Sequence, residues 1–318
     1  MRRVVAIANA KGGVGKTSVA AGLAGLAARA GHRVLTVDAD PQGNLSLDLG
    51  YPISDGQSLA LAIQNGHQLS PLRGVRPNLD CIAGGSALFD IPATYVSRMA
   101  RGQTMNGLRP ALDMVTPDAP ADEYDLVLVD TPPGEPVLQE LVFHASDYLI
   151  IPTRSDEASL DGLVTVAHRF AATRHNNPSL RLLGVLLFGV RHGSTRLREG
   201  VRASLEEALE GAAPVFRTAV RYHESAAVDM RRHGLLPYEL EQRHAAEKSA
   251  RLARLHGGLP GKQADGLLSR DAAGLSADYA ALAEEILAAI VELESTPAGA
   301  PEPEPAPARR PAPGNARA

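Results

Sequence analysis

Short apolar runs alternate with longer alanine- and leucine-rich stretches along this chain. Residues 3–8 form a short run rich in β-branched side chains, which is typical of a buried parallel strand. Residues 16–31 are rich in alanine and leucine and end at a glycine, which predicts a helix. Residues 33–40 form a second buried run that ends in two aspartates. Strand, loop, helix and strand in this order form the βαβ unit of a parallel sheet.

The same alternation continues over most of the chain and predicts an α/β fold with a doubly wound, mostly parallel sheet. Further strands are expected at 78–83, 124–130, 147–152, 181–188 and 216–222. Helices are expected near 135–145, 157–175 and 195–210, and as a last amphipathic helix at 276–294. Segment 51–120 is harder to interpret, and we expect two helices there besides the strand at 78–83.

Two segments depart from this alternation. Residues 242–275 are rich in Arg, Ala and Gly and only partly periodic, which indicates an irregular excursion before the last helix. Residues 296–318 alternate Pro, Ala, Glu and Arg, which predicts a disordered tail with polyproline-II character. We therefore expect one domain over residues 1–295, followed by the tail.

Composition limits the classes of protein to consider. The 318 residues are 44% hydrophobic and 21% charged, enough for a full globular core. A formal net charge of −4 means that any nucleic-acid affinity must come from a local basic patch. The one cysteine, Cys81, excludes an intrachain disulfide and is expected to pack in the core. No apolar run is long enough to span a membrane, and the apolar start is too short for a signal peptide, so we expect a cytoplasmic protein.

A glycine-rich loop, NAKGGVGKTS at residues 9–18, follows the first strand and opens the first helix. Its glycines let backbone N–H groups converge on an anion, and the helix adds the positive end of its dipole. In such a P-loop, Lys16 is placed for the β- and γ-phosphates and the Thr17 hydroxyl for Mg²⁺. Ala10 replaces a glycine of the usual motif, but the other glycines relax the loop. The residues expected to contact the nucleotide are Gly12, Gly13, Val14, Gly15, Lys16, Thr17 and Ser18.

Aspartates stand at the ends of two further strands. Asp130 ends the apolar run LVLVD and can hold Mg²⁺ through water, as a Walker-B aspartate does. Asp38 and Asp40 end the second strand, where a carboxylate can position or deprotonate a water for attack on the γ-phosphate. We expect these strands to lie beside the P-loop.

The segments KGGVGKT, VDADPQGN and YDLVLVDTPP together resemble the ParA/MinD family of deviant Walker A ATPases, and within it ParA-type partition proteins. The similarity continues through residues 145–163 and 182–201 and weakens after about residue 240. The resemblance implies ATP and Mg²⁺ as ligands. It also implies a homodimer that encloses ATP between its subunits.

The resemblance assigns roles to particular residues. Lys11, the second lysine of the loop, is expected to bind the phosphates of the partner's ATP and to neutralise charge on the transferring phosphoryl group. Asp40 is assigned to activation of the attacking water, and the metal environment to Thr17, Asp38 and Asp130. Where the family often has Asn or Thr, this chain has Phe188, so contacts to the base are not assigned. The family's frequent PRN segment is replaced here by Arg221, Tyr222 and His223.

ParA-type proteins bind DNA without sequence preference in their ATP form, and a ParB-type partner stimulates a slow hydrolysis. A local surplus of arginines between residues 191 and 232 suits contacts to phosphates, although ordinary ion pairs on a solvated helix are the alternative reading. The candidate DNA-binding residues are Arg191, Arg196, Arg198, Arg202, Arg217 and Arg221. The resemblance implies a nucleoid-associated location.

Other functions of related proteins remain to be weighed. A MinD-like membrane switch needs a terminal amphipathic helix, and the last residues of this chain carry no large apolar side chain. A nitrogenase-type iron protein needs two cluster cysteines per subunit and is excluded. A small-molecule ATP-dependent ligase of related fold is disfavoured by Lys11. A ParA-like ATPase that positions another cargo shares all of this chemistry and stays open.

Overall fold

The computed structural model describes residues 3–105, 107–115, 123–190, 195–209, 213–256 and 272–295. The strands of the described residues are β1 Arg3–Ile7, β2 Val34–Asp38, β3 Leu72–Arg76, β4 Leu79–Ile82, β5 Leu126–Asp130, β6 Tyr148–Thr153, β7 Arg181–Val190 and β8 Val220–Arg221. They form one sheet in the order β3-β4-β2-β5-β1-β6-β7-β8. All neighbouring pairs are parallel except β3 with β4. The predicted doubly wound, mostly parallel sheet is confirmed.

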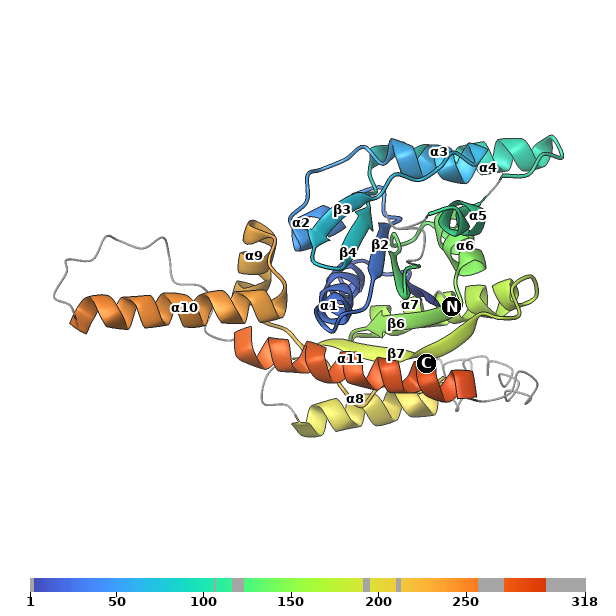
Figure 1. Cartoon of the computed structure of the whole chain (residues 1–318). Helices are drawn as coiled ribbons and strands as arrows, with labels where there is room; N and C mark the ends of the chain where they lie inside the picture. Colours follow the sequence, from blue (N-terminus) through green and yellow to red (C-terminus); the bar gives the residue numbers. More distant parts are fainter. Residues whose placement is uncertain are drawn as a thin grey trace, which may run out of the picture.

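Helices cover both faces of this sheet (Figure 1). The helices are α1 Lys16–Arg29, α2 Leu45–Leu49, α3 Gln57–Asn65, α4 Ile91–Ala100, α5 Leu108–Asp113, α6 Pro136–Ala145, α7 Glu157–Arg174, α8 Thr195–Ala208, α9 Glu224–His233, α10 Pro237–His256 and α11 Ala272–Ser295, with a 3₁₀ helix η1 Ser86–Asp90. One apolar cluster joins the sheet to α3 through α8, and the other joins it to α1, α2, α9, α10 and α11. Cys81 lies fully buried in the second cluster, as expected.

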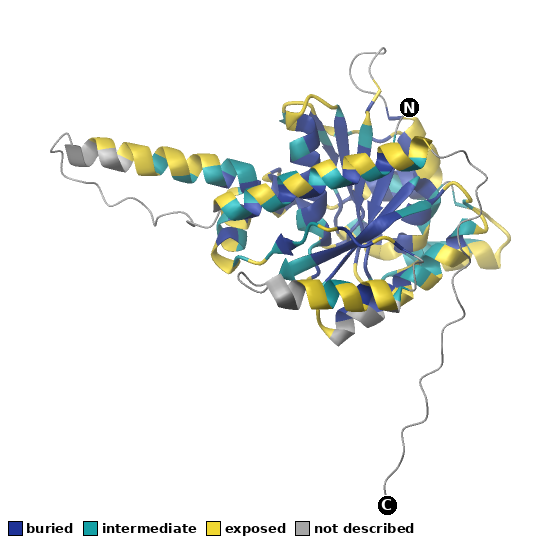
Figure 2. Cartoon of the chain, turned by 90° about the horizontal axis from the view of Figure 1, so that it is seen from below, coloured by how far each residue is buried: buried dark blue, intermediate teal, exposed yellow. Residues whose placement is uncertain are grey.

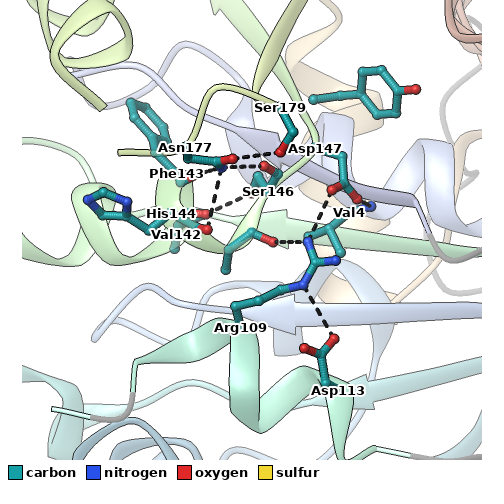
Figure 3. A network of polar contacts seen from close by, with 12 residues as sticks. Val4, Arg109, Asp113, Val142, Phe143, His144, Ser146, Asp147, Asn177 and Ser179 are labelled. Carbon is teal, nitrogen blue, oxygen red and sulfur yellow. Dashed lines mark hydrogen bonds and ion pairs between the residues drawn. The ribbon is translucent and has the colours of Figure 1, made fainter. Parts of the chain in front are cut away.

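A polar network fastens the amino ends of the central strands to the helices on one face (Figure 3). Asp147 precedes β6, accepts a hydrogen bond from the Val4 backbone of β1 at 2.9 Å and pairs with Arg109 of α5 at 3.0 Å. Asn177, after α7, donates to carbonyl oxygens of Phe143 and Ser146 at the end of α6. The network lies at the amino ends of the strands, opposite the P-loop. It therefore stabilises the sheet and takes no part in the site at the carboxyl ends.

Segment 51–120 contains more helices and strands than the sequence indicated. Besides the strand at 78–83 it contains β3 and, among the described residues, α3, η1, α4 and α5. Strand β3 was missed because it is an antiparallel edge strand with mostly exposed side chains, so it has neither an apolar run nor a buried face. The last strand, expected at 216–222, is reduced to Val220–Arg221.

The expectation of an irregular excursion at 242–275 needs a correction for its first part. Residues 242–256 continue helix α10, which extends away from the body of the molecule (Figures 1 and 2). From Gln242 onward the described side chains of α10 are exposed or half-buried, and this absence of a buried stripe explains the weak periodicity. Residues 257–271 and the expected tail at 296–318 lie outside the described residues. No helix of the described chain combines the length and apolar character needed to cross a membrane.

Candidate nucleotide site

The P-loop lies between the carboxyl end of β1 and the start of α1. Gly13 and Gly15 have φ angles of 74° and 91°, which side-chain-bearing residues rarely adopt. The side chain of Asn9 holds the loop against β6. It accepts a hydrogen bond from the Lys11 backbone N–H at 2.9 Å and donates one to the Pro152 carbonyl at 2.8 Å. The sequence predicted the loop. The structural role of Asn9 is visible only from its contact with β6 in the folded chain.

Lys16 is almost fully buried, with an exposed fraction of 5%. Its ammonium donates to the Lys11 carbonyl at 3.0 Å, so it lies inside the curve of the loop where phosphate oxygens are expected. Burial lowers the pKa of Lys16, while the charges of Asp130 and Asp40 oppose that shift. An anion in the loop would add a counter-charge to this buried ammonium.

Three aspartates gather beside the loop because their strands are neighbours. Strand β5 lies between β1 and β2, and Asp38 is paired in register with Asp130. Asp38 accepts backbone hydrogen bonds from Asp40 and Leu45, both at 3.1 Å, which shapes the loop after β2. Asp40 is 6% exposed and accepts from the Gln42 backbone at 2.9 Å. The predicted proximity of these strands to the P-loop is therefore confirmed.

Asp130 is the most unusual of the three. It is fully buried, and neither carboxylate oxygen has a hydrogen-bond partner among the described residues. Burial raises the pKa of Asp130 well above its ordinary value and the charge of Asp38 raises it further, while the neighbouring Thr17 hydroxyl and the charge of Lys16 oppose that rise. For Asp38, burial raises the pKa to about 7. Two buried carboxyl groups with raised pKa values, next to a phosphate-binding loop, fit a site for a divalent cation.

Within the described chain, no three His, Cys, Asp or Glu side chains come together as a metal cage. Mg²⁺ does not need one, because it keeps several waters and takes one or two protein ligands together with substrate phosphates. Asp130, Asp38 and the Thr17 hydroxyl therefore fit a Mg²⁺ that arrives with a nucleotide. When bound, that ion would neutralise charge on the β- and γ-phosphates.

Lys11 points to a different environment from that of Lys16. Its ammonium pairs with Asp156, the N-cap residue of α7, and its side chain is 35% exposed. The Lys11 ammonium lowers the pKa of Asp156. Asp156 was not singled out from the sequence, although it lies in a segment that carries the family resemblance. The two ammonium groups thus lie in different places: that of Lys16 inside the loop and that of Lys11 at the protein surface.

A second layer of side chains supports the loop after β5. The Gln139 side chain of α6 donates to the Pro132 carbonyl at 2.8 Å and to the Asn9 carbonyl at 3.4 Å. Arg169 of α7 in turn donates to Gln139. These residues link the segment after Asp130 to the P-loop, and no sequence motif marked them.

The six candidate DNA-binding arginines have different surroundings. Arg221 makes two hydrogen bonds to Asp278, at 2.6 and 2.7 Å, and Arg202 pairs with Glu206 at 2.8 Å. Arg217 is exposed, and its backbone N–H donates to Glu285. Arg196 and Arg198 belong to α8, but their side chains, like all of Arg191, lie outside the described residues. A role in DNA binding stays a prediction for all six.

Comparison with known proteins defines the class first. A family model described as an AAA domain matches residues 2–182, more than half of the chain, and the chain belongs to that family. Its curated relatives include chromosome-partitioning ATPases. The chain is 36% identical over 205 residues to the chromosome-partitioning ATPase Soj of Thermus thermophilus, covering 64% of this chain and 75% of that protein. It is 34% identical over 189 residues to the chromosome partitioning protein ParA of Caulobacter vibrioides, covering 58% and 68%. The chain is therefore a ParA-type ATPase.

Solved structures confirm the fold. McdA of Cyanothece superposes with a TM-score of 0.65 at 18% identity, over 91% of this chain and 100% of that one. The septum site-determining protein MinD of Pyrococcus horikoshii, solved with Mg-ADP, gives a TM-score of 0.57 at 18% identity, over 91% and 98%. At these identities the likeness shows the shared architecture.

Proposed function

We propose that this protein is a partition ATPase that forms a homodimer on ATP, binds DNA without sequence preference and is stimulated by a ParB-type partner during plasmid or chromosome segregation. The observation that carries the nucleotide chemistry is Asp130, a fully buried carboxylate with both oxygens unpartnered among the described residues. Asp130 lies next to the P-loop, and the buried Lys16 of that loop is close enough for its pKa to respond to the charge of Asp130. The family membership and the partition relatives support the cellular role.

The site residues divide the chemistry among them in this proposal. The backbone of Gly12 through Ser18 and the Lys16 ammonium bind the phosphates, while Thr17, Asp38 and Asp130 hold the Mg²⁺ environment. Asp40 orients and deprotonates the attacking water, because it follows β2 directly, in the loop that Asp38 shapes beside the P-loop. Basal turnover is slow, which gives a switch a long-lived ATP state.

Lys11 supplies the dimer chemistry. Its ion pair with Asp156 is half-exposed, and exposed ion pairs contribute only about 0–1 kcal/mol. The ammonium can therefore exchange Asp156 for phosphates of a nucleotide held by the partner subunit at low cost. In that position it neutralises charge on the transferring phosphoryl group.

The DNA surface is proposed on the side of α8 and the segment that leads to β8. Arg217 is the best described candidate, because it is exposed and its side chain is free to reach a phosphate in the described structure. Arg202 and Arg221 would first have to exchange their acidic partners. DNA binding in the ATP form would place the protein on the nucleoid.

The test is fluorescence anisotropy of a labelled random-sequence duplex with ATP–Mg²⁺, ADP–Mg²⁺ or no nucleotide, across a salt series. We expect salt-sensitive binding with ATP alone, and a shallower salt slope by about one for Arg217→Ala. The matched control is Arg101→Ala, an exposed arginine that follows α4 and lies outside the proposed DNA surface. Absence of binding in every state, with ATP-dependent dimers still visible by sedimentation, would overturn the DNA role and leave the ATPase.

A further inference from the structure

A buried carboxylate that the proposed chemistry does not use lies beside the helix of the P-loop. It belongs to Asp48 of α2, which is only 3% exposed. Helix α2 follows the loop after β2 and packs against both α1 and α9 (Figure 1). The backbones of α2 and α9 also come close where the two helices end, since a Cβ added to Gly50 would stand 3.2 Å from Gly234 Cα. Asp48 is therefore held between the helix of the P-loop and α9.

Asp48 has one partner in each of these two helices. The Ser18 hydroxyl, in the first turn of α1 directly after Thr17, donates a hydrogen bond to one carboxylate oxygen at 2.8 Å. Nε of Arg231 in α9 donates to the other oxygen at 3.0 Å, and the Arg231 side chain is 50% exposed. A chain of three side chains thus connects the phosphate-binding end of α1 to α9.

The charge of Asp48 acts on the nucleotide site. Burial raises the pKa of Asp48, while the charge of Arg231 and the Ser18 hydroxyl oppose that rise and so favour the ionised form. Burial is also the main cause of the raised pKa of Asp38, and the charge of Asp48 adds to it. The field of Asp48 therefore reaches one of the carboxylates proposed for the Mg²⁺ environment.

The sign of this field is unfavourable for an anionic ligand. A negative charge that is removed from water is weakly screened, so it opposes the binding of phosphates in the adjacent loop. The guanidinium of Arg231 supplies the opposite charge. Because Arg231 comes from α9, the segment between β8 and α10, the neutralisation of Asp48 depends on the position of that helix.

We propose that Arg231 and Asp48 form an electrostatic link through which α9 sets the affinity of the P-loop for phosphates. The proposal rests on the proposed ATPase function. Asp48 is a positioning residue in this scheme, because it acts through Ser18 and through its charge. With Arg231 in contact the charge of Asp48 is neutralised, and a displacement of α9 that separates the pair weakens nucleotide binding.

The test is equilibrium binding of N-methylanthraniloyl-ATP with Mg²⁺, competed by ATP and, separately, by inorganic triphosphate. We expect Arg231→Ala to weaken both competitors about fivefold, because Asp48 then lacks its counter-charge, and Arg231→Lys to restore them. Arg232→Ala is the matched control, since it removes the neighbouring exposed arginine of α9 and should change neither.

Two variants of Asp48 separate an electrostatic role from a structural one. Asp48→Asn keeps an acceptor for the Ser18 hydroxyl and removes the charge, so it should bind ATP about twofold more tightly than wild type. The double variant Arg231→Ala with Asp48→Asn should recover the affinity that Arg231→Ala loses. A residue that only supported the fold would give weaker binding in all of these variants.

A double variant as weak as Arg231→Ala would overturn the proposal, because the loss would then not come from the charge of Asp48. Weaker ATP binding by Asp48→Asn would overturn it as well, and this result decides the question where Arg231→Ala does not fold. Wild-type protein that binds no ATP, or Lys16→Ala that binds it normally, would instead contradict the proposed ATPase function.

Discussion

The two lysines of the P-loop differ in their burial and in their partners. Lys16 is buried and bonded to a loop carbonyl, so its ammonium is committed to the phosphate cradle. Lys11 is half-exposed and pairs with Asp156, so its ammonium is available to a second molecule. One residue type therefore has two roles, which burial separates.

At this scale we expect Lys16→Ala to reduce ATP affinity at least 100-fold, because it removes the buried counter-charge of the phosphates. Lys11→Ala should bind ATP within about threefold of wild type but fail to form the ATP-dependent dimer. Calorimetric titration with ATP–Mg²⁺ and analytical ultracentrifugation measure the two effects. Equal losses of ATP affinity in both variants would remove the assignment of Lys11 to the partner's nucleotide.

The buried aspartates make the stability of the nucleotide-free protein depend on pH. Burial raises the pKa of Asp38 to about 7, so the folded state binds this proton more tightly than the unfolded state, whose pKa is about 3.9. The free energy of unfolding should therefore fall as pH rises from about 4 to about 7. Urea unfolding in EDTA between pH 5 and 8 measures the slope, which Asp38→Asn should reduce. An unchanged slope in that variant would show that another group titrates.

Among the elements, α11 illustrates how a late helix completes an early βαβ unit. It crosses the face of the sheet that α1 covers (Figure 2). Its buried Tyr279 contacts α1 at a glycine. A Cβ on Gly22 would stand 2.5 Å from the Tyr279 ring. Two acidic side chains of α11 also bind the backbone around β8. Glu285 accepts a hydrogen bond from the Arg217 N–H, and Asp278 accepts one from the Arg221 N–H.

Gly22→Ala should destabilise the protein by about 1–3 kcal/mol, because the rigid ring of Tyr279 cannot move aside in a packed core. Gly200→Ala is the matched control, since it lies in α8 with nothing within 4 Å of an added Cβ. There the better helix propensity of alanine should stabilise by up to about 1 kcal/mol. Chemical denaturation measures both, and a Gly22→Ala protein as stable as wild type would contradict the packing argument.

On the scale of the whole molecule, ligand binding and stability are linked. Asp130 and Lys16 are buried in the free protein without full compensation, and a nucleotide with its cation supplies both missing charges. A ligand that binds only the folded state at 100 times its Kd stabilises it by about 2.7 kcal/mol.

We therefore expect ATP–Mg²⁺ to raise the melting temperature by several degrees, and ATP with EDTA to raise it less. Differential scanning fluorimetry at a series of ATP concentrations measures the shift. Lys16→Ala serves as the control without a shift. Equal stabilisation with and without Mg²⁺ would show that Asp38 and Asp130 do not take part in cation binding.

The sequence by itself determined the parallel sheet, the P-loop and the positions of Asp38, Asp40 and Asp130 at strand ends. These features are local, because buried parallel strands are continuous apolar runs and a phosphate loop needs glycines at fixed spacing. Only the tertiary structure decided which side chains meet across distant segments: Lys11 with Asp156, Phe188 with Gly15, and Arg221 with Asp278. It also revealed β3 and the helical course of α10, since an edge strand and an exposed helix bury no continuous face and leave no periodic signal. Contacts between residues far apart in sequence depend on how whole helices and strands pack, and local sequence patterns do not encode that packing.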